Sequence, residues 1–124
     1  MSILIVDDNA VMRRTLRTFF EQHSDWAVCG EAVDGLDAIQ KAQQLEPDII
    51  ILDLSMPVMN GFEAARELSR IRPSIPLLMF TSALSPALKQ EARAVGCVDV
   101  ISKSDQQPHH TLLGRINRLR NPGN

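Results

Sequence analysis

The chain has 124 residues, a length that suits one domain able to bury its own core without disulfides or metals. Its composition is 44% hydrophobic and 23% charged with a formal net charge of −2, which gives no strong electrostatic attraction to nucleic acid or anionic membranes. The apolar runs are too short for a transmembrane helix, so we expect a cytoplasmic protein that binds neither membrane nor nucleic acid directly.

Short aliphatic runs of strand length alternate along the chain with segments of helical periodicity. The strand-length runs cover residues 3–6, 26–29, 49–52, 75–80 and 97–101. The segments that follow them repeat apolar residues at i, i+4 and i+7, the spacing of one helix face. These residues are Met12, Leu16 and Phe19 with Phe20; Ala38, Ala42 and Leu45; Ala64, Leu68 and Ile71; Leu88, Ala92 and Val95; and Leu112, Ile116 and Leu119. The pattern predicts five strands and five helices.

Residues that start and stop helices support this division. Ser85 and Pro86 offer an N-cap and a first-turn proline to the fourth helix, and Gly96 follows its end. Pro47 and Pro73 end the second and third helices, because proline disfavours helical geometry in the residue before it. Strands that alternate with helices predict an α/β fold around a parallel sheet, and their largely unbroken aliphatic sequences indicate a sheet covered on both faces.

The alternation occupies residues 1–121, which we expect to form one domain. Residues 122–124 would then be a tail or the start of a linker. The segment 26–31 mixes polar and apolar residues, which suits an edge strand. Cys29 and Cys97 lie in strand-like segments without a Cys-x-x-Cys arrangement, and we interpret both as reduced residues of the core.

Polar side chains follow the ends of four predicted strands. They are Asp7 and Asp8 after the first strand, Asp53 after the third, Thr81 and Ser82 after the fourth, and Lys103 just beyond the fifth. Taken singly, each has a structural explanation as a helix cap, a turn residue or a solvated lysine. Because the carboxyl ends of parallel strands meet at one edge of a sheet, where ligands bind, we expect these residues to converge on one site.

Asp53 follows four aliphatic residues and places a carboxylate at the end of a buried strand, where an unpaired charge is costly. Two carboxylates ~4 Å apart repel by on the order of 4 kcal/mol at an effective dielectric constant of about 20. Mg²⁺ relieves such repulsion and prefers a few carboxylates together with water and phosphate oxygens. We therefore expect Asp53 to be a nucleophile toward phosphorus, with Lys103 and Thr81 binding phosphoryl oxygens.

The chain resembles a response-regulator receiver domain of two-component signalling over nearly its whole length. The resemblance is carried by the acidic pair in ILIVDD, the segment ILDLSMPVMNG, the Thr81–Ser82 hydroxyls and Lys103 in VISKSD. It implies a flavodoxin-like, doubly wound fold with strand order 2-1-3-4-5 and five helices on both faces of the sheet. It also implies a phosphoprotein that turns over no external substrate.

The resemblance assigns a role to each residue of the predicted site. Asp53 is the phosphoacceptor, and Mg²⁺ is bound by Asp8, Asp53 and the main-chain carbonyl of Ser55, with Asp7 acting through water. Thr81 is the switch hydroxyl, and Lys103 is the phosphate-binding lysine. The implied phosphoryl donor is a sensor histidine kinase or a phosphotransfer protein. A homodimer or an output partner would use the face formed by the fourth helix, fifth strand and fifth helix.

Three features bear on this expectation. Val100 stands where receivers carry a tyrosine or phenylalanine, so we expect weaker or different coupling between phosphorylation and the output face. Ser104 stands where they commonly carry a proline, so we expect a trans peptide bond there. The implied strand order separates Cys29 from Cys97 by four strand spacings, roughly 19 Å, which excludes a disulfide.

Three other classes of protein would need features that this sequence lacks. A haloacid-dehalogenase-like phosphatase would place a second acid two residues after its nucleophile, where this chain has Ser55. A flavin or nucleotide binder would need a glycine-rich or hydroxyl-rich turn after the first strand, where this chain has Asp7 and Asp8. A complete transcription factor would need a DNA-binding motif beyond the five strands and five helices. His109 and His110 are expected to be surface residues, not metal ligands.

Overall fold

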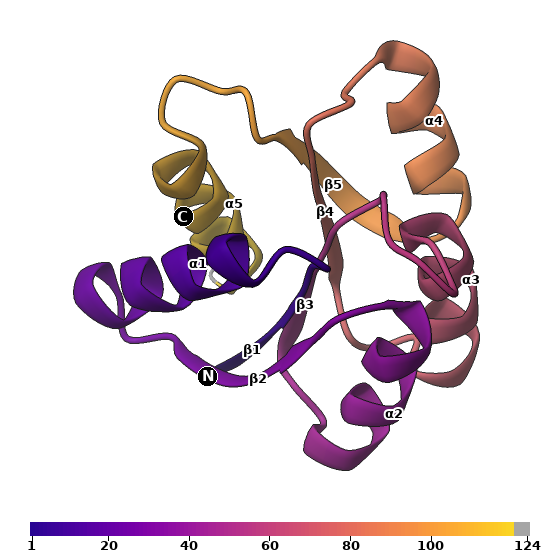
Figure 1. The fold of residues 1–124 in the computed structure, drawn as a ribbon, viewed down its shortest axis with the longest axis horizontal. Coiled ribbons are helices and arrows are strands. Elements are labelled where there is room, and N and C mark those ends of the chain that lie inside the picture. Colours follow the sequence, from indigo (N-terminus) through magenta and orange to yellow (C-terminus); the bar gives the residue numbers. More distant parts are fainter. Residues whose placement is uncertain (121–124) are drawn as a thin grey trace.

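A computed structural model describes residues 1–120 and shows a parallel sheet in the order β2-β1-β3-β4-β5, with five helices (Figure 1). The strands are β1 (Ser2–Val6), β2 (Ala27–Ala32), β3 (Ile49–Leu52), β4 (Leu77–Thr81) and β5 (Cys97–Ser102). The helices are α1 (Ala10–His23), α2 (Gly35–Leu45), α3 (Gly61–Ile71), α4 (Pro86–Ala94) and α5 (Pro108–Arg120). The predicted fold class and strand order are confirmed.

The strands contribute side chains to two hydrophobic cores, one on each face of the sheet. Side chains alternate along a strand, so Ile3 and Ile5 of β1 pack on one face and Leu4 and Val6 on the other. The Ile3 side packs against α1 and α5, and the Leu4 side packs against α2, α3 and α4. Figure 1 shows this division, with α1 and α5 on one side of the sheet and the other three helices opposite. Both faces are covered, as the unbroken aliphatic strands predict.

The helix ends carry the caps that their sequences favour. Ser85 accepts a hydrogen bond from the backbone N–H of Leu88 and is the N-cap of α4, as predicted. Gly96 lies beyond the end of that helix with a φ of +108°, a conformation that glycine adopts at little cost. Asn60 and Glu63 form a capping box at the start of α3, which fixes where that helix leaves the loop after β3.

Two strands have a boundary that differs from the prediction by more than one residue. β2 spans Ala27–Ala32, which extends beyond the apolar run at 26–29 and lies close to the segment 26–31 that was predicted as an edge strand, and it is an edge strand as expected. Its register against β1 shifts between Ile3 and Leu4, and this bulge allows the strand to continue through its polar end. β4 begins at Leu77, not residue 75, because the intervening Pro76 has no N–H to donate.

Other expectations can also be compared with residues 1–120. Leu45 and Leu119 occupy the helix face predicted to be buried, yet both are exposed, because each lies in the last turn of its helix. Cys29 and Cys97 are free thiols on the two edge strands. The described peptide bonds are all trans, including the one before Ser104. Within this part of the chain, no helix is long and apolar enough to cross a membrane. The predicted tail at 122–124 lies outside the described residues.

Candidate functional site

Three carboxylates meet at the carboxyl edge of the sheet. Asp7 and Asp8 follow β1, Asp53 follows β3, and one oxygen of each lies within 4.8 Å of the others. Backbone hydrogen bonds fix the two strand ends, because the N–H of Asp53 donates to Val6 at 2.9 Å. Asp7 is 2% exposed and Asp53 is 6% exposed, whereas Asp8 is open to solvent. The predicted convergence of these three residues is confirmed.

Lys103 is the counter-ion of the buried acids. Its Nζ lies 2.7 Å from Asp7 Oδ2 and 3.3 Å from Asp53 Oδ1. Its backbone N–H donates to the carbonyl of Thr81 at 2.8 Å, which holds the start of the β5–α5 loop against the end of β4. The sequence predicts that Mg²⁺ relieves the repulsion among the acids. The structure shows that lysine supplies part of this relief.

The pKa of Asp53 lies above its ordinary value. Burial is the largest cause, because it disfavours the ionised form, and the charge of Asp7 adds to it. The ammonium of Lys103 and the backbone N–H of Leu54, which donates to Asp53 Oδ1 at 2.9 Å, act in the opposite direction. The carboxylate is therefore held in an environment that favours neutralisation by a proton, a cation or a covalent bond.

The loop after Asp53 returns closely to the strand end. The N–H of Gly61 donates to the carbonyl of Leu54 at 2.8 Å. A Cβ at residue 61 would lie 2.3 Å from the carbonyl oxygen of Asp53, so a side chain cannot be accommodated there. Ser55 is exposed within this loop, two residues beyond Asp53.

Thr81 is buried as the last residue of β4, not the first of the following loop. Its Oγ1 accepts a hydrogen bond from the N–H of Ala83 at 3.2 Å. Val100 on β5 is 5% exposed, so the position where receivers carry an aromatic side chain is here filled by a small buried aliphatic.

Sequence reasoning missed three residues around the site. Phe80 is buried on β4, and Lys103 Nζ lies 5.8 Å from its ring centroid. Arg13 of α1 donates to the main-chain carbonyl of Asp7 and pairs with Glu31 of β2. The sequence does offer a signal for the Arg13–Glu31 pair. Two arginines lie four residues apart on one helix, and a lone acid lies on a neighbouring strand.

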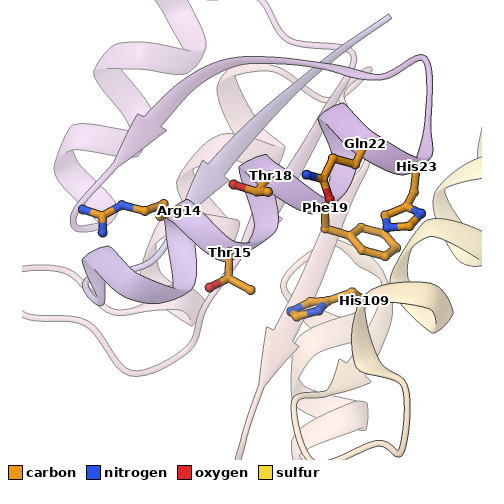
Figure 2. A pocket seen from close by; sticks show the side chains of 7 residues that line it. All are labelled: Arg14, Thr15, Thr18, Phe19, Gln22, His23 and His109. Carbon is orange, nitrogen blue, oxygen red and sulfur yellow. The ribbon is translucent and has the colours of Figure 1, made fainter.

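A cavity of about 370 Å³ lies along α1 beside the start of α5 (Figure 2). It is lined by Arg14, Thr15, Thr18, Phe19, Gln22, His23 and His109. None of these belongs to the acidic site. His109 is less exposed than predicted: it is half-buried, 5.4 Å from the Phe19 ring, and its pKa is lowered by burial and then by the charge of His110. His110 is exposed, as expected.

Comparison with known proteins decides the family. A profile described as the response regulator receiver domain matches residues 3–113. The chain belongs to the response regulator receiver domain family. Receiver domains are the phosphoacceptor modules of two-component signalling, and the resemblance inferred from the sequence motifs is confirmed.

Individual relatives support this assignment. The response regulator domain of Thermotoga maritima CheB is 34% identical, with a TM-score of 0.89 over 95% of this chain and 94% of that one. Chemotaxis protein CheY4 of Vibrio cholerae is also 34% identical, with a TM-score of 0.84 over 94% and 96%. A protein-glutamate methylesterase/protein-glutamine glutaminase of Methanosarcina acetivorans is 37% identical over 90% of this chain, which spans 32% of that relative's length.

Proposed function

We propose that this receiver is a signalling switch that accepts a phosphoryl group on Asp53 and requires Mg²⁺ to do so. The supporting observation is the meeting of Asp7, Asp8 and Asp53 within 4.8 Å, beside the ammonium of Lys103. Carboxylate oxygens are hard ligands of the kind that Mg²⁺ prefers, and main-chain carbonyl oxygens are hard ligands as well. Asp8, Asp53 and the carbonyl of Ser55 would bind the ion directly, with Asp7 acting through water.

The proposed reaction is an in-line transfer. An oxygen of Asp53 attacks phosphorus, the bond to the donor's leaving nitrogen or oxygen breaks, and that electron pair leaves with the donor. Bound Mg²⁺ would offset charge on the transferred oxygens. Lys103 exchanges its contact with the Asp53 carboxylate for one with the phosphoryl group, and the Thr81 hydroxyl donates to another phosphoryl oxygen. The product is an aspartyl phosphate.

The proposed donor is a sensor histidine kinase or a phosphotransfer protein, and the proposed product acts on a partner, not on a substrate. The output face expected from the family comprises α4, β5 and α5. Here it carries an exposed Val98 and an ion pair between Asp99 of β5 and Arg115 of α5. Because Val100 is small and buried, we propose that Thr81 moves without an aromatic partner, which weakens or redirects coupling to this face.

The proposal is tested by treating the protein with acetyl phosphate and Mg²⁺ and measuring its intact mass. Wild type should gain one phosphoryl group that hydroxylamine removes, whereas Asp53→Asn should gain none. Asp25→Asn, which neutralises an exposed carboxylate outside the acidic cluster, is the matched control and should behave as wild type. Labelling of Asp53→Asn at the wild-type level would place the acceptor elsewhere.

A further inference from the structure

Arg13 links the first helix to the main chain of the acidic site. Its Nη1 donates to the carbonyl oxygen of Asp7 at 2.6 Å, and its Nε pairs with Glu31 Oε1 at 3.0 Å. Only 14% of the Arg13 side chain is exposed, so the guanidinium is packed between α1 and the sheet edge. A planar guanidinium that makes two contacts in different directions is fixed in orientation as well as in place.

Glu31 is held by several cations at once. Its second carboxylate oxygen accepts from Arg17 Nε at 2.8 Å, one helical turn beyond Arg13, and its main-chain carbonyl accepts from Lys41 of α2. Burial disfavours its ionisation, but the hydrogen bonds and charges of Arg17 and Arg13 outweigh that cost, so the pKa of Glu31 lies below its ordinary value. The carboxylate is therefore charged at neutral pH and anchors both arginines.

The carbonyl that Arg13 contacts belongs to the peptide unit joining Asp7 to Asp8. The orientation of this peptide unit determines how the two carboxylates are presented relative to each other. Groups that orient ligands from outside the ligand shell typically change metal affinity by roughly 10–100-fold when they are removed. We propose that Arg13 is a positioning residue for the Mg²⁺ site, that it acts by fixing the Asp7–Asp8 peptide, and that Glu31 holds it in place. This inference rests on the proposed function.

An effect of charge and an effect of geometry would change the Mg²⁺ affinity in opposite directions when Arg13 is replaced. This difference makes the inference testable. A cation near a metal site repels the metal, so removal of the guanidinium by charge alone would strengthen Mg²⁺ binding. Loss of the positioning contact would weaken it. Arg17 supplies a matched control, because it pairs with the same Glu31 carboxylate and contacts the carbonyl of Val28, not that of Asp7.

The test is calorimetric titration of Mg²⁺ into wild type, Arg13→Gln and Arg17→Gln, with circular dichroism to check folding. We expect Arg13→Gln to weaken Mg²⁺ binding about tenfold and Arg17→Gln to change it by less than about twofold. Glu31→Gln should weaken it in the same direction as Arg13→Gln and replaces that variant if it does not fold. Equal effects of the two arginine variants, or unchanged or tighter Mg²⁺ binding by Arg13→Gln, would overturn the inference.

A second readout separates this inference from the proposed function. The backbone amide resonance of Asp8 reports the orientation of the Asp7–Asp8 peptide without any metal. It should shift in Arg13→Gln and stay in place in Arg17→Gln. If wild type binds no Mg²⁺, the proposed metal role fails, and the amide resonance alone decides whether Arg13 positions the peptide. An unshifted Asp8 amide in Arg13→Gln overturns the positioning role in either case.

Discussion

Replacement of Asp53 by asparagine should stabilise the protein in the absence of Mg²⁺. Asparagine has nearly the same shape, and its side-chain oxygen can still accept the hydrogen bond from the backbone N–H of Leu54. The substitution removes a charge whose ionisation the fold opposes, as the raised pKa of Asp53 indicates. A residue that is retained at a cost to stability is expected where function requires it.

The magnitude follows from the distances in the acidic cluster. Asp7 and Asp8 lie within 4.8 Å of Asp53 and each repels its charge by about 3.5 kcal/mol at an effective dielectric constant of about 20. Lys103 at 3.3 Å attracts it by about 5 kcal/mol. The balance is a net repulsion of about 2 kcal/mol before burial is counted, which corresponds to a rise in melting temperature of about 8 °C for a domain of this length.

The assay is thermal unfolding in a chelator and in millimolar Mg²⁺, with Asp25→Asn as the control. In the chelator, Asp53→Asn should melt well above wild type, and the control should shift by no more than about 0.5 kcal/mol. Mg²⁺ should raise the melting temperature of wild type more than that of Asp53→Asn, because it relieves the repulsion in the folded state. A lower melting temperature for Asp53→Asn in the chelator, or equal stabilisation of both proteins by Mg²⁺, would refute the reasoning.

Three further predictions follow. The difference in unfolding free energy between wild type and Asp53→Asn should close as the pH falls from 7 toward 3.8, the ordinary pKa of the Asp53 carboxyl. The reason is that a carboxyl whose pKa is raised in the folded state destabilises the fold only where it is ionised, at higher pH. A difference that persists at pH 3 in urea titrations would contradict this. Gly61→Ala should lower the free energy of unfolding by about 3 kcal/mol, because the new Cβ meets the backbone of Asp53. Gly114→Ala, in open space on α5, should raise it by up to about 1 kcal/mol. Equal melting temperatures of the two variants would count against the close approach at residue 61. His109→Gln should reduce the loss of stability on acidification through pH 6.5. The lowered pKa of His109 in the folded state makes the unfolded chain the better proton acceptor, so acid favours unfolding of the wild type. The same pH profile for His109→Gln and the control His23→Gln would exclude this.

The sequence predicts the sheet well where local patterns decide the structure. Strand β3 lies at Ile49–Leu52 as predicted, because four consecutive aliphatic residues fit a central strand and little else. The apolar run of β2 ends at Cys29, but the mixed segment 26–31 was assigned to an edge strand, and its polar residues do enter the sheet, through a bulge against β1. The start of β4 was misplaced because the aliphatic run continues across Pro76, which cannot donate to a ladder.

The site, too, is predictable where local sequence patterns determine it and not where helix packing does. The convergence of Asp7, Asp8 and Asp53 could be predicted because parallel strands place their carboxyl ends at one edge. For the contact between Arg13 and Glu31, the spacing of the arginines on α1 signals a shared acid but does not identify it, since the contact depends on how α1 lies across an edge strand. The half-buried state of His109 likewise depends on where α5 meets Phe19, which no pattern near His109 reveals.

The location of the phosphoryl group tests the central claim most directly. After reaction with acetyl phosphate and Mg²⁺, borohydride reduction converts an aspartyl phosphate into a stable alcohol that tandem mass spectrometry assigns to one residue. We predict that the label lies at Asp53 and that a chelator abolishes it. Label at another residue, or labelling that is undiminished without Mg²⁺, would contradict the proposed function.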